Sequence, residues 1–357
     1  MTASEKLVDL LHLTGGMGVL IHDPSNMFYL TEGYTGEGFV YLTAERRVIV
    51  TDFRYTEAAE KDAPGFEVVM TDKDHPASKR LAELCEADQV RELRYESNFL
   101  SVDEYEKLRG ALGDEISWIP LRQAPQKIRE IKTPAEIVTM RKAGAITSEA
   151  FEAVLPKIRV GMTETELRLE LEYTMFRLGA DELAFHTIIA SGVNGSLPHA
   201  VPGSRKLQNG DMITMDFGAK VGGYCSDMTR TVALGEPSAE MKKIYSTVLR
   251  AQAMCEAALA AGKSCFDIDR LARDYIDSQG YAGRFGHGLG HCVGIDIHEN
   301  PRLSPACHDT LEAGMVITVE PGIYVPSLGG VRIENTCLVK ENGSEPLTTA
   351  RKELIIL

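Results

Sequence analysis

The sequence predicts an α+β protein of two domains, in which a smaller N-terminal α/β domain precedes a larger α+β domain. Three observations carry this prediction. The chain has 357 residues, more than one ordinary core accommodates. Short β-rich runs alternate with helical patterns over residues 17–119. After residue 133, a pair of helical patterns followed by strand-like runs occurs twice.

The composition is that of a globular protein and argues against nucleic acid as a partner. Hydrophobic residues make up 44% of the chain, and the net charge is −14. Phosphate binding needs clustered cations, so the acid excess favours a cationic or metallic partner. Neither a signal peptide nor a long apolar run is visible, so we expect no membrane partner and a cytoplasmic location. The seven cysteines are scattered and contain no C-x-x-C pair, which indicates buried thiols in a reducing compartment.

The N-terminal domain is predicted from five β-rich runs, MGVLI, FVYL, RRVIVTDF, FEVVM and ISWI, with helical patterns at 76–87 and 102–112. A polar, charged segment with two prolines, RQAPQKIREIKTP, follows. We therefore expect an N-terminal domain over residues 1–122, a linker over 123–133 and a second domain over 134–357.

Two helices should open the second domain. Thr133 and Glu136 form a predicted capping box with Pro134 in the first turn, and Thr163 and Glu166 form a second box. Gly179 supplies a stop for the second helix. Strand-like runs FHTIIAS, DMITMDFGA and YCSDMTRTVAL follow.

The same order then repeats. Helical patterns at 238–261 and 267–279 precede strand-like runs HCVGIDIHE, MVITVE and VRIENTCLV. The repeat suggests a pseudo-symmetric domain whose two halves meet face to face, with room for a site between them.

Two aspartates lie close together in DMITMDFGAKVGGYCSD. If Val221 and Gly222 form a two-residue hairpin turn, Asp216 faces Asp227 across the strands. Facing residues have Cβ atoms roughly 4.5–5.5 Å apart. Two buried carboxylates at that range require a shared proton or a cation. The alternative is that both aspartate side chains point into solvent at the end of the hairpin.

Glu320 and Glu334 occupy runs that are otherwise β-branched and apolar, MVITVEPG and GVRIENTCLV. Arg332 lies two residues before Glu334, hence on the same strand face, where it can orient a carboxylate. An ordinary surface pair of arginine and glutamate is the alternative.

Three histidines cluster with glycines in RFGHGLGHCVGIDIHEN, namely His287, His291 and His298. Imidazole is the commonest metal ligand, and glycine lets the backbone approach a ligand closely. Structural histidines are the alternative. The run lacks G-x-G-x-x-G spacing, and the chain has no G-x-S-x-G motif or P-loop, so dinucleotide, acyl-serine and nucleotide chemistries lack their motifs.

Four carboxylates and an imidazole form a donor set for two divalent cations, and the oxygen-rich field matches Mn²⁺, Co²⁺ or Zn²⁺. Four negative charges balance two dications, whereas a single dication would leave a buried net charge of about −2. Two ions can bridge a water, lower its pKa and polarise a carbonyl for hydrolysis.

These motifs resemble the pita-bread metallopeptidase family and, within it, the branch of Xaa-Pro aminopeptidases and prolidases. The resemblance covers nearly the whole chain, and its combined order of motifs is highly specific. It implies a C-terminal pita-bread catalytic domain and a ribonuclease H-like N-terminal domain. The matching segments are residues 182–203, 215–232, 286–299, 315–324 and 331–339.

The resemblance also implies the roles of individual residues. It implies two divalent ions per subunit, Mn²⁺ ahead of Co²⁺ or Zn²⁺, and a homodimer. The implied metal ligands are Asp216, Asp227, His291, Glu320 and Glu334. Asp227 and Glu334 would bridge the ions, and Glu320 would also act as the base. The other implied catalytic-site residues are His199, His287, His298 and Arg332.

The expected function is hydrolysis of the bond between an N-terminal residue and proline, by attack of a metal-bridging hydroxide. A dipeptidase restricted to Xaa-Pro is the alternative, and the sequence does not separate the two. A metal-free amidinohydrolase resembling creatinase and a silent binding module are less favoured, because all five ligands are retained. His186 has no assigned role, and a pocket contact and a packing residue both stay open.

Overall fold

The computed structural model describes all of residues 1–357 and divides into two compact units, Met1–Arg129 and Glu130–Leu357. The division falls inside the segment expected as a linker. That segment is partly helical, because α6 (Ala124–Arg129) forms there. The Arg129 guanidinium donates to Asn26 Oδ1 at 2.7 Å, which ties α6 to the first unit. No helix of either unit is long and apolar enough to cross a membrane.

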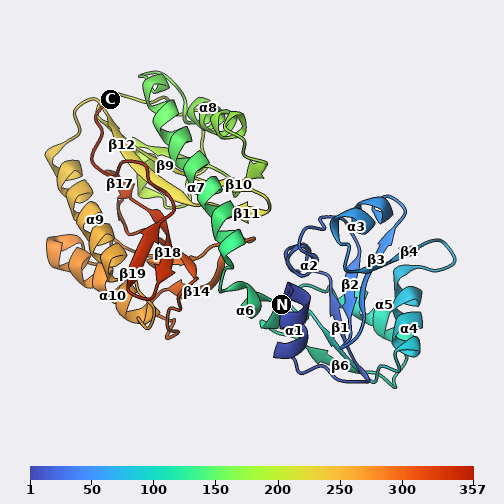
Figure 1. The fold of residues 1–357 in the computed structure, drawn as a ribbon. Helices are drawn as coiled ribbons and strands as arrows, with labels where there is room; N and C mark the ends of the chain where they lie inside the picture. Colours follow the sequence, from blue (N-terminus) through green and yellow to red (C-terminus); the bar gives the residue numbers. More distant parts are fainter. The chain divides into compact units, whose positions relative to one another are not determined.

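The first unit is built on a six-stranded mixed sheet in the order β4-β3-β2-β1-β5-β6 (Figure 1). Strands β1, β2 and β3 pair antiparallel, and the remaining pairs are parallel. Its strands are β1 (Met17–Ile21), β2 (Phe39–Leu42), β3 (Arg47–Asp52), β4 (Glu67–Thr71), β5 (Glu92–Tyr95) and β6 (Ser117–Pro120). Its other helices are α1 (Ala3–Leu10), α2 (Pro24–Thr31), α3 (Thr56–Asp62), α4 (Ala77–Ala87) and α5 (Val102–Leu112).

The first half of the second unit combines two long helices with short antiparallel sheets. Both predicted capping boxes are present, at Thr133 for α7 and at Thr163 for α8. The helical elements are α7 (Pro134–Val154), η1 (Leu155–Lys157), α8 (Glu164–Arg177) and η2 (Gly192–Ser196). The strands are β7 (Glu182–Leu183), β8 (Ile188–Ser191), β9 (Asp211–Phe217), β10 (Ala219–Val221), β11 (Tyr224–Cys225) and β12 (Met228–Leu234).

The second half repeats the arrangement with a larger sheet in the order β14-β13-β15-β18-β19 and a separate hairpin of β16 and β17. Its helical elements are α9 (Ala239–Ala258), α10 (Cys265–Ile276) and η3 (Asp277–Tyr281). Its strands are β13 (Gly290–Cys292), β14 (Glu299–Leu303), β15 (Val316–Val319), β16 (Gly322–Val325), β17 (Gly329–Arg332), β18 (Asn335–Lys340) and β19 (Gly343–Pro346).

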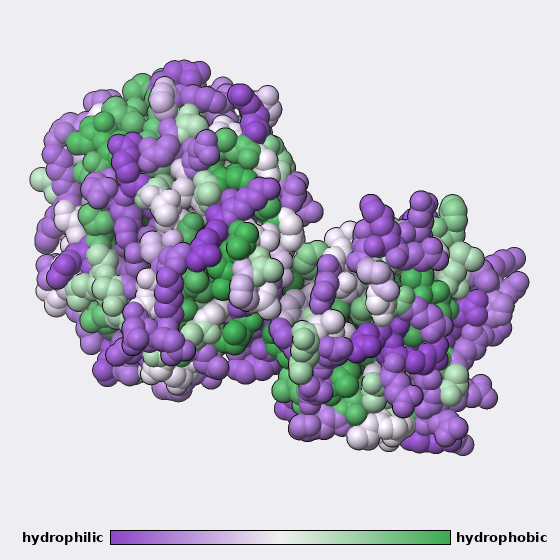
Figure 2. Space-filling model, viewed as in Figure 1, coloured by the Kyte–Doolittle hydropathy of each residue, from purple (hydrophilic) through white to green (hydrophobic).

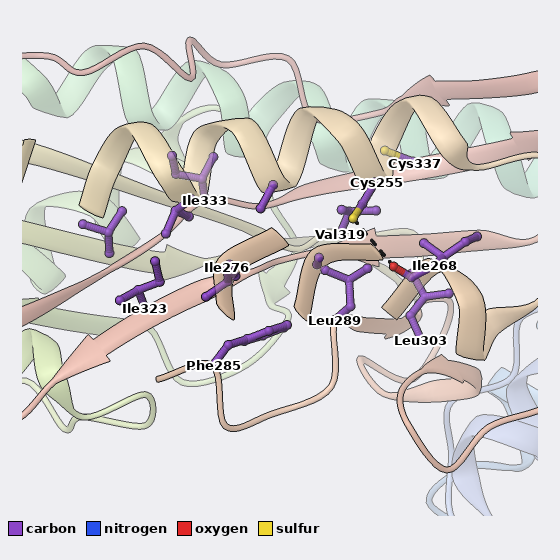
Figure 3. Packing of buried hydrophobic residues seen from close by; sticks show 14 of the residues in the cluster. Cys255, Ile268, Ile276, Phe285, Leu289, Leu303, Val319, Ile323, Ile333 and Cys337 are labelled. Atoms are coloured by element: carbon purple, nitrogen blue, oxygen red, sulfur yellow. Dashed lines mark hydrogen bonds between the residues drawn. The ribbon is translucent and has the colours of Figure 1, made fainter. Parts of the chain in front are cut away.

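Each half of the second unit has its own hydrophobic core. In the first half α7 and α8 cover apolar residues of β9 and β12, such as Met215 and Val232. In the second half α9 and α10 lie side by side (Figure 1) over the inner face of the sheet, where Ile268 and Val319 pack in one cluster (Figure 3). The face drawn in Figure 2 is largely hydrophilic with hydrophobic residues in smaller patches, so much of the apolar content lies in these cores.

Two strand predictions in the second half are wrong in extent. The run HCVGIDIHE is not one strand, because β13 ends at Cys292 beside a register shift and β14 begins only at Glu299. The run VRIENTCLV is divided, since β17 ends at Arg332 and β18 begins at Asn335. Both interruptions carry side chains into the cavity described next.

Candidate metal centre and active site

A cavity of about 490 Å³ opens in the second unit and is lined by residues of both halves. All nine side chains that the sequence singles out contribute to its wall. They are His199, Asp216, Asp227, His287, His291, His298, Glu320, Arg332 and Glu334.

The two aspartates come from the hairpin region of the first half, but the predicted register is wrong. Gly222 and Gly223 form the turn, with φ of 52° and 80°, because Val221 pairs with Tyr224. Asp216 therefore pairs with Thr229 instead of Asp227. The error is two residues, so both aspartates still lie on one face, as diagonal neighbours.

The acids of the second half lie in breaks between strands. Glu320 follows β15, and Glu334 lies between β17 and β18. The Glu334 backbone N–H donates to Thr229 O at 3.1 Å, and the Thr229 hydroxyl donates to Glu334 Oε2 at 2.6 Å. Thr229 thus joins the two halves and fixes the direction of the Glu334 side chain.

His291 lies on β13 with a defined tautomer. Its Nδ1 lies 3.1 Å from Cys292 O, and because a carbonyl only accepts, Nδ1 carries the proton. Nε2 then carries a lone pair that can bind a cation, and it lies 3.6 Å from Asp227 Oδ2 and 3.4 Å from Glu320 Oε1. Burial lowers the pKa of His291 to about 3, which keeps the ring neutral.

The carboxylates repel one another because they are buried close together. Burial raises the pKa of Asp227 well above its ordinary range, and the nearby charge of Glu334 raises it further. Burial likewise raises the pKa of Glu334, with Glu320 adding to the effect. The pKa of Glu320 rises to about 8 for the same main reason, burial.

The donor set fits divalent cations. Ligand atoms of Asp216, Asp227 and Glu334 all lie within 4.8 Å of one another. Asp216 Oδ1 and Glu334 Oε1 are buried and have no protein hydrogen-bond partner. Unpartnered buried carboxylate oxygens are costly, and a cation satisfies them while cancelling the repulsion. Oxygen donors with one imidazole suit Mn²⁺, Co²⁺ or Zn²⁺.

Arg332 binds one carboxylate of the cavity directly and a second one indirectly. Its Nη2 donates to Asp216 Oδ2 at 2.6 Å. It reaches Glu334 indirectly, because its Nε donates to the Thr229 hydroxyl at 3.1 Å. The guanidinium is almost completely buried, so it orients two acidic residues at once.

Tyr324 is a member of the site that the sequence analysis missed. Its hydroxyl accepts from Arg332 Nη1 at 2.9 Å and lies 2.8 Å from His287 Nε2. His287 Nδ1 lies 2.8 Å from Gly288 O and so carries the proton, which leaves Nε2 to accept from Tyr324. Burial and the charge of Arg332 lower the pKa of His287 to about 4.

The other histidines lie nearer the opening. The His298 ring lies edge-on to the His291 ring, with centroids 4.5 Å apart, and burial lowers its pKa. His199 is exposed, in the loop after β8. His186, for which no role was assigned, lines a second, largely apolar cavity of about 450 Å³ that shares Ile188 and His199 with the first.

Two family models match this chain, and both belong to the same group of peptidases. Residues 138–341 match the model of metallopeptidase family M24, and residues 4–131 match the creatinase/prolidase N-terminal domain.

Curated and solved relatives agree over nearly the full length. An Xaa-Pro dipeptidase of Pyrococcus furiosus is 35% identical over 98% of this chain and 99% of its own. A solved Xaa-Pro dipeptidase from Bacillus anthracis is 38% identical with a TM-score of 0.95, covering 99% of each chain. A solved X-Pro aminopeptidase from Thermotoga maritima is 34% identical with a TM-score of 0.91, also covering 99% of each. The chain therefore belongs to metallopeptidase family M24, has the two-domain α+β architecture of its pita-bread members, and is a metal-dependent hydrolase.

Proposed function

We propose that this hydrolase cleaves the bond between an N-terminal residue and proline, with Xaa-Pro dipeptides as its main substrates. The observation that carries the proposal is the convergence of four carboxylates and one imidazole in a single cavity. The names of the relatives support proline specificity, and two of the three reported above are dipeptidases. Action on longer peptides is the second candidate, supported by the name of the Thermotoga maritima relative.

Asp216, Asp227, His291, Glu320 and Glu334 are the proposed ligands of two divalent ions, Mn²⁺ ahead of Co²⁺ or Zn²⁺. When bound, such ions polarise the scissile carbonyl and lower the pKa of water. The Coulomb argument supports two ions, since two dications balance four carboxylates. Arg332 and Thr229 keep the ligand carboxylates of Asp216 and Glu334 in place.

Glu320 is the proposed general base. Thr318 Oγ1 donates to Glu320 Oε1 at 3.2 Å, which directs the carboxylate toward the centre of the cavity beside His291. A carboxylate in that position can accept a proton from water and return it to the leaving nitrogen. The other four proposed ligands position the reacting groups.

The histidines of the wall are proposed to orient the peptide. A bond to proline is a tertiary amide with no N–H, so the site must hold the substrate through its carbonyl, amine and ring. His287 is fixed as a neutral ring by Gly288 and Tyr324, which suits packing against an uncharged group. His199 and His298 stand at the opening, where they can contact the carbonyl or the tetrahedral intermediate.

A peptide panel tests this proposal. Chelator-treated protein, reloaded with Mn²⁺, should cleave Ala-Pro faster than Ala-Pro-Ala and should leave Ala-Ala largely uncut. Higher turnover of Ala-Pro-Ala would favour the aminopeptidase. Equal rates on Ala-Ala, or activity that survives full removal of the metal, would refute the proposal.

A further inference from the structure

The loop that carries His199 is an exposed part of the cavity wall. Residues 192–203 follow β8 and border both cavities. Around His199 the loop exposes 57% of Leu197 and 85% of Val201. Near the centre of the loop, the Pro198 carbonyl accepts from Arg332 Nη1 at 3.3 Å. Something other than hydrophobic packing must therefore fix this part of the wall.

Both ends of the loop bind one buried carboxylate, that of Glu164 in the first turn of α8. Glu164 Oε1 accepts from the Ser191 backbone N–H at 2.9 Å and from the Ser191 hydroxyl at 2.7 Å. Oε2 accepts from the Gly203 N–H at 3.2 Å, and the Asn194 amide donates to both oxygens, at 3.1 and 3.2 Å. One side chain thus closes a loop of twelve residues.

The chemistry of these contacts needs a carboxylate. Glu164 is 1% exposed, and the hydrogen bonds that it accepts come from neutral groups. Burying a charge is costly, although the first turn of a helix favours an anion. In a glutamine at this position, the amide NH₂ would replace one carboxylate oxygen and would face N–H donors of the loop. The hydrogen bonds at that end of the loop would then be lost. Nearby Arg205 binds the Ser191 hydroxyl and Asp211, which holds the start of the loop from the other side.

The first part of the loop is also held against the second half of the domain. A Cβ on Gly330 would lie 2.2 Å from Gly195 O, and a Cβ on Gly329 would lie 2.7 Å from Gly192 O. The backbones are therefore in direct contact, and β17, which ends at Arg332, supports the loop start. The far end of the segment from Leu197 to Pro202 is held by Glu164 Oε2 and by the neighbouring Thr165, whose backbone N–H and hydroxyl donate to Gly203 O at 3.1 and 3.0 Å. Of these two residues, only Glu164 also binds the start of the loop.

We propose that Glu164 is a positioning residue that closes the 192–203 loop and thereby holds His199 at the cavity. The proposal rests on the proposed peptidase function for the role of His199, but the closure of the loop does not. Glu164 acts on the loop and makes no hydrogen bond or ion pair with the five proposed ligands.

The kinetic test compares Glu164→Gln with Glu166→Gln. Both glutamates lie in the first turn of α8, but Glu166 is exposed and only caps the helix through Thr163. We expect Glu164→Gln to lower kcat/KM for Ala-Pro by about tenfold or more, because small misplacements of positioning groups cost rate. Glu166→Gln should stay within about twofold, and both variants should bind Mn²⁺ as tightly as the unsubstituted protein. Unchanged kinetics, or weakened Mn²⁺ binding, in Glu164→Gln would overturn the proposal.

A double-mutant cycle separates positioning from a general loss of structure. In a His199→Ala background, Glu164→Gln should cost less than about twofold, because its effect is exerted through His199. Losses that multiply independently would contradict this. If the unsubstituted protein cleaves no Xaa-Pro peptide, limited proteolysis at the exposed Leu197 still tests whether Glu164 closes the loop. Glu164→Gln should then be cut faster than Glu166→Gln, and equal rates would overturn it.

Discussion

At the scale of single residues, the main feature of this site is that several acidic side chains are buried close together, where ionising them is costly. Asp227 and Glu334 are 5% and 1% exposed, and burial together with the charges of acidic neighbours raises the cost of ionising each of them. One buried arginine, Arg332, offsets only part of this charge. The remaining excess is the physical reason to expect cations in the cavity.

Replacing Glu320 by glutamine removes the proposed base with little change in volume. We expect kcat to fall by about 10²–10⁴-fold, the usual contribution of general acid–base catalysis. Above about pH 8, where Glu320 ionises, the thermal stability of the metal-free protein should hold or rise, because a buried charge is removed. Steady-state kinetics with Ala-Pro and a thermal melt measure both effects. Turnover equal to that of the unsubstituted protein would eliminate Glu320 as the base.

Tyr324→Phe tests the connection from Arg332 to His287. Without the hydroxyl, His287 Nε2 loses its donor, and we expect kcat/KM to fall about tenfold. Tyr245→Phe is a matched control, because its buried hydroxyl donates to Lys352 O, outside the cavity. It should cost about 1 kcal/mol of stability but little activity. Equal activity losses in the two variants would show that Tyr324 acts only through stability.

Residue chemistry could be read from the sequence better than residue contacts. Acids inside apolar runs predicted the cluster, because such positions need a partner. The prediction that Asp216 faces Asp227 was wrong. Gly222 and Gly223 both adopt positive φ, so the turn forms one residue later than predicted. Tyr324 was missed because a tyrosine in an apolar run looks like core, and only the fold brings its hydroxyl to Arg332.

At the scale of elements, the two halves of the second unit are joined by a buried arginine. Arg230 on β12 is 1% exposed. Its Nη1 donates to the carbonyls of Thr229 and Glu334, and its Nη2 donates to Asn335 Oδ1 and Ala350 O. The guanidinium therefore holds the Glu334 backbone and the C-terminal segment on one strand of the first half.

Arg230→Met should destabilise the fold strongly, because it leaves buried carbonyls without donors. We expect a loss of about 3 kcal/mol or more in the free energy of unfolding. Arg230→Lys should recover part of this, since an ammonium can still reach some of the carbonyls. Denaturant titrations measure the series. If Arg230→Met unfolds at the same denaturant concentration as the parent, the network is not stabilising.

Elements with local signals were predicted well, and elements defined by partners were not. The capping boxes at Thr133 and Thr163 and the helix Val102–Leu112 are confirmed, because their signals are local in sequence. Strand β5 was missed, since ELRY alternates charged residues and is recognisable only between β1 and β6. The segment 293–298 was predicted as strand, but its ladder ends at the shift beside Cys292.

At the scale of the whole molecule, metal binding and folding should be linked through pH. In the metal-free protein the pKa of Glu320 is about 8, against an ordinary value of 4.5. Glu320 therefore binds its proton more tightly in the folded state than in the unfolded state, so its contribution to stability is lost as pH rises toward about 8. The neutral rings of His287 and His291 have the opposite effect below about pH 6.5, so we expect the net fall in stability between about pH 6.5 and about pH 8. Thermal melts of chelator-treated protein should show this slope, and saturating Mn²⁺ should raise the melting temperature most at the upper end. Stability that rises through this range without metal would contradict the assignment.

The central claim is that the five acidic and imidazole side chains form one site for two divalent cations. Elemental analysis of chelator-treated protein after equilibrium dialysis against Mn²⁺ tests it most directly, with Asp227→Asn as the comparison. The account predicts about two ions per chain and fewer in the variant, because one of the five proposed ligands is lost. A chain that takes up no ion, or the same number with and without Asp227, would contradict it.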